Sequence, residues 1–179
     1  GIDHVLLGWD HLLFILGLVL LVRPRQVIGV ATSFTVAHSL TLAITALGFV
    51  SVPSRPVEIL IAGSIVLLAI EVIRKHRGED SLAARKPWII AFAIGLIHGF
   101  GFAGALADIG LPKGQELLAL FNIGVEIGQI IVIVAALIFL WGLSKVSKPG
   151  RRMTETLATY CIGAIGMFWA MERLSAYIV

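Results

Sequence analysis

Two Asp-His pairs stand near the start of the chain, in a segment that is otherwise apolar. They are Asp3 with His4 and Asp10 with His11, inside GIDHVLLGWDHLLFILGLVLLV. Inserting an ionisable side chain into a membrane costs about 2.5 to 3.5 kcal/mol for Asp at the centre, so such residues usually face a cavity and carry function. Imidazole and carboxylate groups together suit divalent transition metals. The pairs therefore indicate polar chemistry, with metal binding as the first candidate.

The spacing of the two pairs predicts two polar levels. In an unbroken helix a step of seven residues returns to nearly the same face and advances about 10.5 Å. His4 is then expected above His11, and Asp3 above Asp10, too far apart for one ion to be held at both levels. We expect Asp3 and His4 to form an outer access region, and Asp10 and His11 to border a deeper site.

A third histidine, His38, stands in ATSFTVAHSLTLAITALG, among hydroxyl residues at helical spacing. Ser and Thr commonly bond their own backbone or a neighbouring helix, so most of these hydroxyls are expected to serve packing. Two interpretations of His38 stay open: a buried neutral imidazole bonded to one hydroxyl, or a metal ligand.

A fourth histidine, His98, stands beside a row of small residues in WIIAFAIGLIHGFGFAGALADIG. Ala91, Gly95, Gly99 and Ala103 recur every four residues, a pattern that lets another helix approach closely. His98 is expected to project into the bundle interior beside that seam.

Among the carboxylates of the chain, Glu126 is the strongest functional candidate. In FNIGVEIGQIIVIV, it shares one polar face with Asn122 and Gln129, flanked by Gly124 and Gly128. About ten residues of membrane helix, roughly 15 Å, precede it on its outer side, which predicts a position near mid-bilayer. A glutamate there must be protonated, paired or bound to a cation. A neutral carboxylic acid hydrogen-bonded to Asn or His is the structural alternative.

Imidazole and carboxylate without thiolate favour Ni²⁺, Co²⁺, Zn²⁺ or Fe²⁺ over Mg²⁺ or Ca²⁺. The single cysteine, Cys161, excludes a cysteine-cluster site. The candidate metal ligands are His4, Asp10, His11, His38, His98 and Glu126. The candidate pathway or supporting residues are Asp3, Ser39, Thr41, Asn122 and Gln129.

Composition indicates the elements that must position these residues. Of 179 residues, 58% are hydrophobic and only 14% charged, and the mean hydropathy is +0.98, values that exclude an ordinary water-soluble domain. Apolar segments long enough to cross a hydrocarbon core of about 30 Å recur six times. They span residues 4–22, 27–50, 57–73, 88–108, 116–143 and 154–177. We expect an all-α bundle of six transmembrane helices, in one domain over residues 1–179.

The charges of the connecting segments predict the orientation. Cations gather after the first, third and fifth apolar segments, at Arg23, Arg25, Arg74, Lys75, Arg77, Arg85, Lys86, Lys145, Lys148, Arg151 and Arg152. The opposite side carries only Arg55, Lys113 and Arg173. The positive-inside rule then places both termini outside the cytoplasm of a bacterial-type cytoplasmic membrane.

The net charge of +3 needs no nucleic-acid partner, because anchoring to membrane lipid accounts for its distribution. The chain begins with Gly1 rather than methionine, and we expect either that a signal peptide has been removed or that the sequence was cut there.

Four ordered motifs resemble the HupE/UreJ family of nickel and cobalt permease-like membrane proteins. The first, GxDHxLF, lies at Gly8, Asp10, His11, Leu13 and Phe14. The others are FTVAHSLTL, GLIHGFGFAG and FNIGVEIGQ. The resemblance covers essentially the whole chain, and it implies a membrane permease that transports a Ni²⁺-like or Co²⁺-like ion.

The predicted function is therefore metal transport, with neutral imidazoles as ligands and carboxylates offsetting the charge of the ion. No nucleotide-binding motif is present, so an ion gradient, the membrane potential or metal trapping would supply the energy. An intramembrane metalloenzyme is the alternative, with zinc-bound water and Glu126 as general base, although no HExxH signature exists. A membrane metal sensor or assembly factor is a third interpretation.

Overall fold

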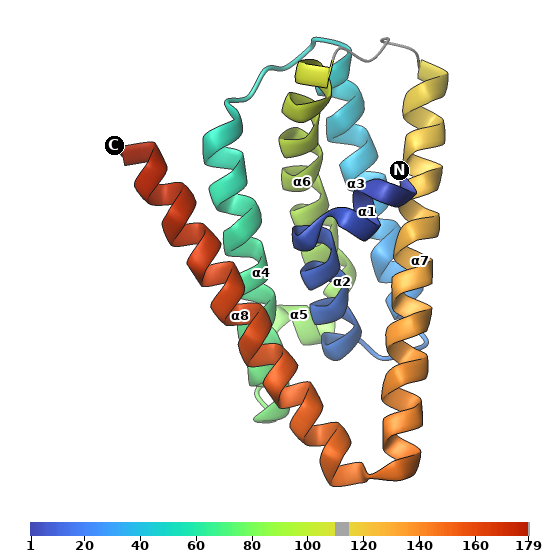
Figure 1. Cartoon of the computed structure of the whole chain (residues 1–179). Helices are drawn as coiled ribbons and strands as arrows, with labels where there is room; N and C mark the ends of the chain where they lie inside the picture. The colour runs from blue at the N-terminus through green and yellow to red at the C-terminus, as the bar shows by residue number, and fades with distance from the viewer. Residues whose placement is uncertain (110–114, 179) are drawn as a thin grey trace.

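The computed structural model describes the backbone of residues 1–109 and 115–178, and the side chains of residues 1–102 and 118–178. These residues form helices and no β-strand, which agrees with the predicted all-α class (Figure 1). The helices are α1 (Ile2–Leu7), α2 (Trp9–Leu21), α3 (Val27–Ala46), α4 (Ser54–His76), α5 (Leu82–Arg85), α6 (Pro87–Ile109), α7 (Gln115–Val146) and α8 (Lys148–Ile178).

The long helices alternate in direction along the bundle. Figure 1 shows the α2–α3, α4–α6 and α7–α8 connections at one end, with the α3–α4 connection at the other. The cation-rich connections therefore share one end of the molecule. Lys113, which was predicted to lie on the opposite side, is outside the described residues.

Three helical segments in the described part of the chain are long and apolar enough to cross a membrane: Val27–Ala46, Ser54–His76 and Leu118–Val146. Trp9–Leu21 and Pro87–Phe102 are apolar but shorter. α8 (Lys148–Ile178) is not among these segments. The protein is thus a helical membrane-embedded chain with three candidate spans and further apolar helices.

The first apolar segment was predicted to be one helix over residues 4–22, and this prediction is wrong. The chain breaks at Gly8, where extended backbone (φ −80°, ψ 99°) separates α1 from α2. The amide of Gly8 donates to the carbonyl of His4 and closes α1. A Cβ at Gly8 would collide with that same carbonyl oxygen, so the missing side chain permits the turn.

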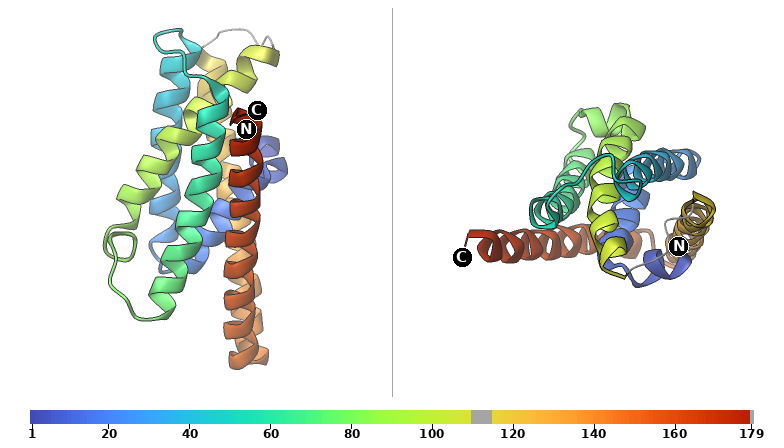
Figure 2. Two further views of the ribbon diagram at one scale, coloured as in Figure 1. Left: turned by 90° about the vertical axis from the view of Figure 1, so that its left-hand side faces the viewer. Right: turned by 90° about the horizontal axis from the view of Figure 1, so that it is seen from above.

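Small residues set the closest helix contacts, on α6 as predicted and also on α7. A Cβ on Gly99 would collide with the side chain of Thr41 and the carbonyl of His38, so α6 lies directly against α3. A Cβ on Gly124 would stand 3.0 Å from the Cα of Gly1, which places α1 against α7 (Figure 2). Gly and Ala at such crossings let backbones approach closely.

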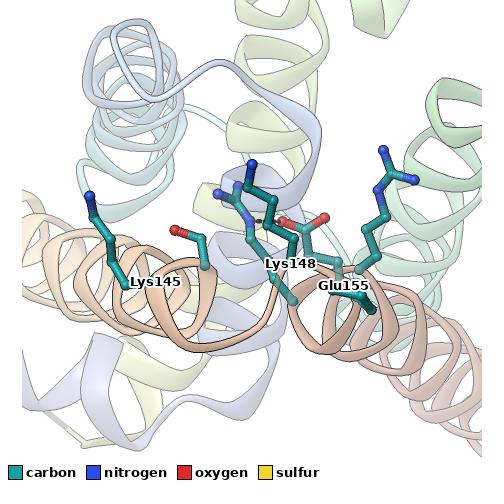
Figure 3. A pocket seen from close by; sticks show the side chains of 7 residues that line it. Lys145, Lys148 and Glu155 are labelled. Atoms are coloured by element: carbon teal, nitrogen blue, oxygen red, sulfur yellow. Dashed lines mark hydrogen bonds and ion pairs between the residues drawn. The ribbon is translucent and has the colours of Figure 1, made fainter.

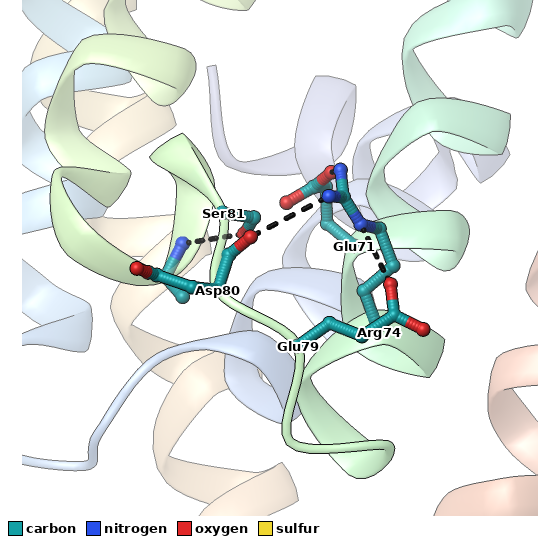
Figure 4. A network of polar contacts seen from close by, with 6 residues as sticks. Glu71, Arg74, Glu79, Asp80 and Ser81 are labelled. Carbon is teal, nitrogen blue, oxygen red and sulfur yellow. Dashed lines mark hydrogen bonds and ion pairs between the residues drawn. The ribbon is translucent and has the colours of Figure 1, made fainter.

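Polar contacts tie the helix ends together at the cation-rich end (Figure 4). Arg74 donates to the carboxylate of Glu71 at 3.1 Å and to that of Glu79 at 3.2 Å. Ser81 caps α5 by accepting a bond from the amide of Ala84 at 3.1 Å. The end of α4 is therefore joined to the connecting segment that carries α5.

Candidate metal centre

Four histidines from four helices lie together inside the bundle. His4 comes from α1, His11 from α2, His38 from α3 and His98 from α6. The ring centres of His4 and His11 are 4.5 Å apart, and those of His11 and His98 are 5.3 Å apart. His38 lies 6.1 Å from His11 and 6.3 Å from His4 by the same measure. His11, His38 and His98 are buried, with at most 5% of their surface exposed.

The break at Gly8 brings His4 into this cluster. An unbroken helix would separate His4 and His11 by about 10.5 Å along its axis, whereas their rings lie 4.5 Å apart. The predicted separation of an outer level at His4 from a deeper level at His11 is therefore wrong. α1 runs at an angle to α2 (Figure 1), and the two imidazole rings lie side by side.

Most of the ring nitrogens in the cluster are buried without a hydrogen-bond partner. Among the described residues, this holds for Nε2 of His4, Nδ1 of His98 and both nitrogens of His11 and of His38. Nε2 of His98, in contrast, lies 3.4 Å from the hydroxyl of Ser64 on α4. Buried polar atoms are nearly always hydrogen-bonded in proteins, so a group of unpartnered imidazole nitrogens calls for a functional reason.

The family described as HupE / UreJ protein matches residues 1–173. The chain belongs to the HupE/UreJ family. No curated protein and no solved structure matched the chain. Family membership and the apolar helices together indicate a membrane protein with a role related to nickel or cobalt transport.

The motifs of this HupE/UreJ chain also supply an aromatic wall that the sequence analysis missed. The ring of Phe102 lies 4.0 Å from that of His4, and Phe121 lies 5.3 Å from it. Phe34 lies 5.8 Å from His38 and 5.2 Å from His98. The signal was present, because Phe34 precedes His38 by four residues and Phe102 follows His98 by four, which places each pair on one helix face.

The first-segment carboxylates of the HupE/UreJ chain differ in position. Asp10 has an oxygen 3.8 Å from Nδ1 of His11, at the edge of the cluster. Asp3 is exposed on α1. Of the two, Asp10 alone is held beside a histidine in the described structure.

Glu126 and Gln129 face α3 rather than the histidine rings. The hydroxyl of Thr32 donates to Glu126 at 2.6 Å, and that of Thr35 donates to Gln129 at 3.3 Å. The second carboxylate oxygen of Glu126 is buried without a partner among the described residues. No hydrogen bond or ion pair within that part of the chain joins Glu126 to a histidine. Thr32 precedes His38 by six residues, about 9 Å along α3.

The remaining candidates mostly bond backbone. Ser39 donates to the carbonyl of Thr35 at 2.6 Å, and Thr41 to that of Ala37 at 3.2 Å. The expectation that most hydroxyls of this stripe serve packing is confirmed for these two. Asn122 donates to the carbonyl of Leu118 at 2.8 Å.

The donor atoms of the cluster do not meet at one point. Over the residues described, no three His, Cys, Asp or Glu side chains are arranged to hold a metal ion. The rings nevertheless lie close, and those of His11 and His98 are nearly perpendicular, with an interplanar angle of 89°. Binding would therefore require rotation of the imidazoles about their side-chain bonds.

Proposed function

We propose that this HupE/UreJ protein carries a divalent transition-metal ion, Ni²⁺ or Co²⁺ in character, across the cytoplasmic membrane through the histidine cluster. One observation carries the proposal: four histidines from four helices converge, and most of their buried ring nitrogens have no partner within the described residues. Neutral imidazole nitrogens are ligands for such ions, and a group of them in an apolar wall has no evident packing role.

The ring spacing supports this role. An imidazole nitrogen binds a transition metal at about 2.0 Å, which puts the ring centres of two ligands roughly 5 Å apart. The ring centres of His4, His11, His38 and His98 that approach each other are separated by 4.5 to 6.3 Å. A bound ion thus needs reorientation of the rings but little movement of the helices.

The carboxylates are assigned supporting roles in transport. Asp10 beside His11 offsets the charge of the ion at the cluster. Glu126, with one oxygen held by Thr32 and one unpartnered, offers a second anionic position on the side of the bundle formed by α3 and α7. Asp3, exposed on α1, suits the outer approach to the cluster.

The proposed membrane arrangement has six passes in a single domain, made by α1 with α2, α3, α4, α6, α7 and α8. The cation-rich connections share one end in Figure 1, and the positive-inside rule assigns that end to the cytoplasm. Both termini then lie outside. The alternating directions of the helices support the arrangement, with residues 154–177 of α8 as the sixth pass.

The transport cycle would expose the cluster to one side and then to the other. Small sliding motions would take place at the close glycine contacts of α6 with α3 and of α7 with α1. An ion gradient, the membrane potential or metal trapping would supply the energy.

Replacing one cluster histidine tests the proposal. His98→Gln removes a buried imidazole, and His76→Gln removes the exposed one at the end of α4 as the matched control. Uptake of Ni²⁺ or Co²⁺ by intact cells and metal binding to the purified protein are measured for both. Loss of a residue that supports a metal ligand typically lowers metal affinity by roughly 10- to 100-fold. Because His98 is proposed as a ligand itself, we expect His98→Gln to lower metal affinity by at least that factor and to abolish metal uptake.

Two results would contradict transport by this site. Wild-type protein that binds no divalent metal at neutral pH would leave the histidines as structural residues. Protein that binds metal through His98 yet moves none into cells would favour the metalloenzyme or sensor.

A further inference from the structure

A hollow opens at the turn between α7 and α8, at the cation-rich end of the bundle. It measures about 780 Å³ and is lined by Lys145, Lys148, Arg151, Arg152 and Glu155 together with small residues of the turn. Figure 3 shows Lys145, Lys148 and Glu155 extending from the same side of the turn. The hollow lies away from the histidine cluster and takes no part in the proposed transport chemistry.

The charges of the hollow are unbalanced. Its one carboxylate, Glu155, is already paired with Arg151 at 2.8 Å. Lys145, Lys148 and Arg152 form no ion pair with any described residue. α8 also begins here, and the N-terminus of a helix carries partial positive charge. Positive charges gathered in a concave surface attract an anion.

On the α7 side, an exposed apolar side chain stands next to Lys145, one of the residues that line the hollow. The ammonium of Lys145 lies 5.5 Å from the ring centre of Trp141, whose side chain is 62% exposed. Val146 on the same helix is also exposed. Tryptophan and lysine side chains commonly mark the level of lipid headgroups at the end of a membrane helix. A ligand whose anionic end lies in the hollow would thus meet cations there, and an apolar part that extends along α7 would meet exposed apolar side chains.

We propose that this hollow binds the phosphate headgroup of an anionic phospholipid, with the acyl chains lying along the exposed apolar side chains of α7. The cations of Lys145, Lys148 and Arg152 hold the headgroup, and the Arg151–Glu155 pair fixes the wall of the hollow. A free phosphate ion would use the cations alone. The exposed Trp141 beside Lys145 favours the lipid.

The test measures lipid binding to the purified full-length chain in detergent. The pocket variant is Lys148→Gln with Arg152→Gln. The control is Arg25→Gln with Lys86→Gln, which removes two exposed cations from the same end outside the hollow. Phosphatidylglycerol, phosphatidylcholine and inorganic phosphate are titrated separately, and bound lipid is counted by native mass spectrometry.

We expect phosphatidylglycerol to bind more tightly than phosphatidylcholine. The pocket variant should lose about fivefold in phosphatidylglycerol affinity for each cation removed, and the control should lose less than twofold. Circular dichroism establishes that each variant is folded. If the pocket variant does not fold, Lys148→Gln alone should show the single fivefold loss.

Three outcomes would overturn the proposal. One is equal binding of phosphatidylglycerol and phosphatidylcholine. Another is an equal loss in the pocket and control variants. The third is that inorganic phosphate loses as much affinity as phosphatidylglycerol does in the pocket variant and also displaces the lipid completely. That result would make the hollow a site for a free anion.

Discussion

Only one of the two carboxylate oxygens of Glu126 has a hydrogen-bond partner among the described residues. Thr32 donates to one carboxylate oxygen at 2.6 Å, and the other oxygen is buried without a partner among the described residues. A carboxylate in an apolar environment carries a high cost unless it is protonated, paired or bound to a cation. The hydroxyl of Thr32 satisfies one acceptor but supplies no charge. Glu126 therefore stays a candidate for balancing the charge of the transported ion.

Replacing Glu126 by Gln removes the negative charge of the side chain but keeps its size, so the two contributions can be measured separately. Glu126→Gln keeps the size of the side chain and an oxygen for Thr32, so the fold should survive while metal affinity falls about tenfold or more. Glu172→Gln on the exposed end of α8 is the matched control. Metal affinity and uptake are measured together with the melting temperature. Unchanged affinity and uptake in Glu126→Gln would assign Glu126 a structural hydrogen bond only.

Metal binding should weaken as the pH falls. A coordinating imidazole must be neutral, so a proton that binds the ring nitrogen competes with the ion. If two or more histidines coordinate together, affinity should fall by more than about tenfold per pH unit once the metal-free imidazoles become protonated. Calorimetric titration of Ni²⁺ or Co²⁺ from pH 8 down to the lowest pH at which the secondary structure is intact measures the slope. Binding that strengthens as the pH falls would contradict coordination by imidazole nitrogens.

At the scale of the helices, the contact between α3 and α6 positions two of the four histidines. Gly99 lies one residue after His98, and a Cβ there would collide with Thr41 and with the carbonyl of His38. The two helices can therefore come this close only because Gly99 has no Cβ atom. His38 and His98 reach the same cluster because this crossing is so close.

Gly99→Ala should therefore destabilise the protein and disturb the cluster. Overpacking of a tight contact costs about 1 to 3 kcal/mol, and one of the two clashing neighbours, the carbonyl of His38, is backbone and cannot rotate away. Gly63→Ala on α4 is the control, because a Cβ there meets nothing within 4 Å, and Ala favours helix over Gly by about 1 kcal/mol. Thermal unfolding in detergent should show a lower melting temperature for Gly99→Ala and an unchanged or higher one for Gly63→Ala. Equal melting temperatures would show that α6 can shift without cost.

At the scale of the whole molecule, the orientation in the membrane follows from charge. The α4–α6 connection lies at the cation-rich end, and the α3–α4 connection at the other (Figure 1). In a background where Cys161 is replaced by Ser, Asp80→Cys should react with a membrane-impermeant thiol reagent only after permeabilisation. Ser51→Cys should react in intact cells. The reverse pattern would invert the membrane orientation and the side from which the ion enters.

Much of this protein could be predicted from local pattern alone. Long apolar segments imply helices, because a backbone in lipid must satisfy its own hydrogen bonds. The small residues at Gly95 and Gly99 predicted a close helix contact, and the structure supplies α3 as its partner. The histidines stood out because polar groups in apolar segments are costly.

Other features depended on tertiary structure. The break at Gly8 was missed, because its dihedral angles are open to any residue and only the approach of His4 requires a glycine there. That break moved His4 from a separate level to the side of His11. Thr32 became the partner of Glu126 although 94 residues separate them, and no periodicity reports such a pairing. Helical spacing shows which residues share a face of one helix, whereas the neighbour that each face meets is decided only when the helices pack.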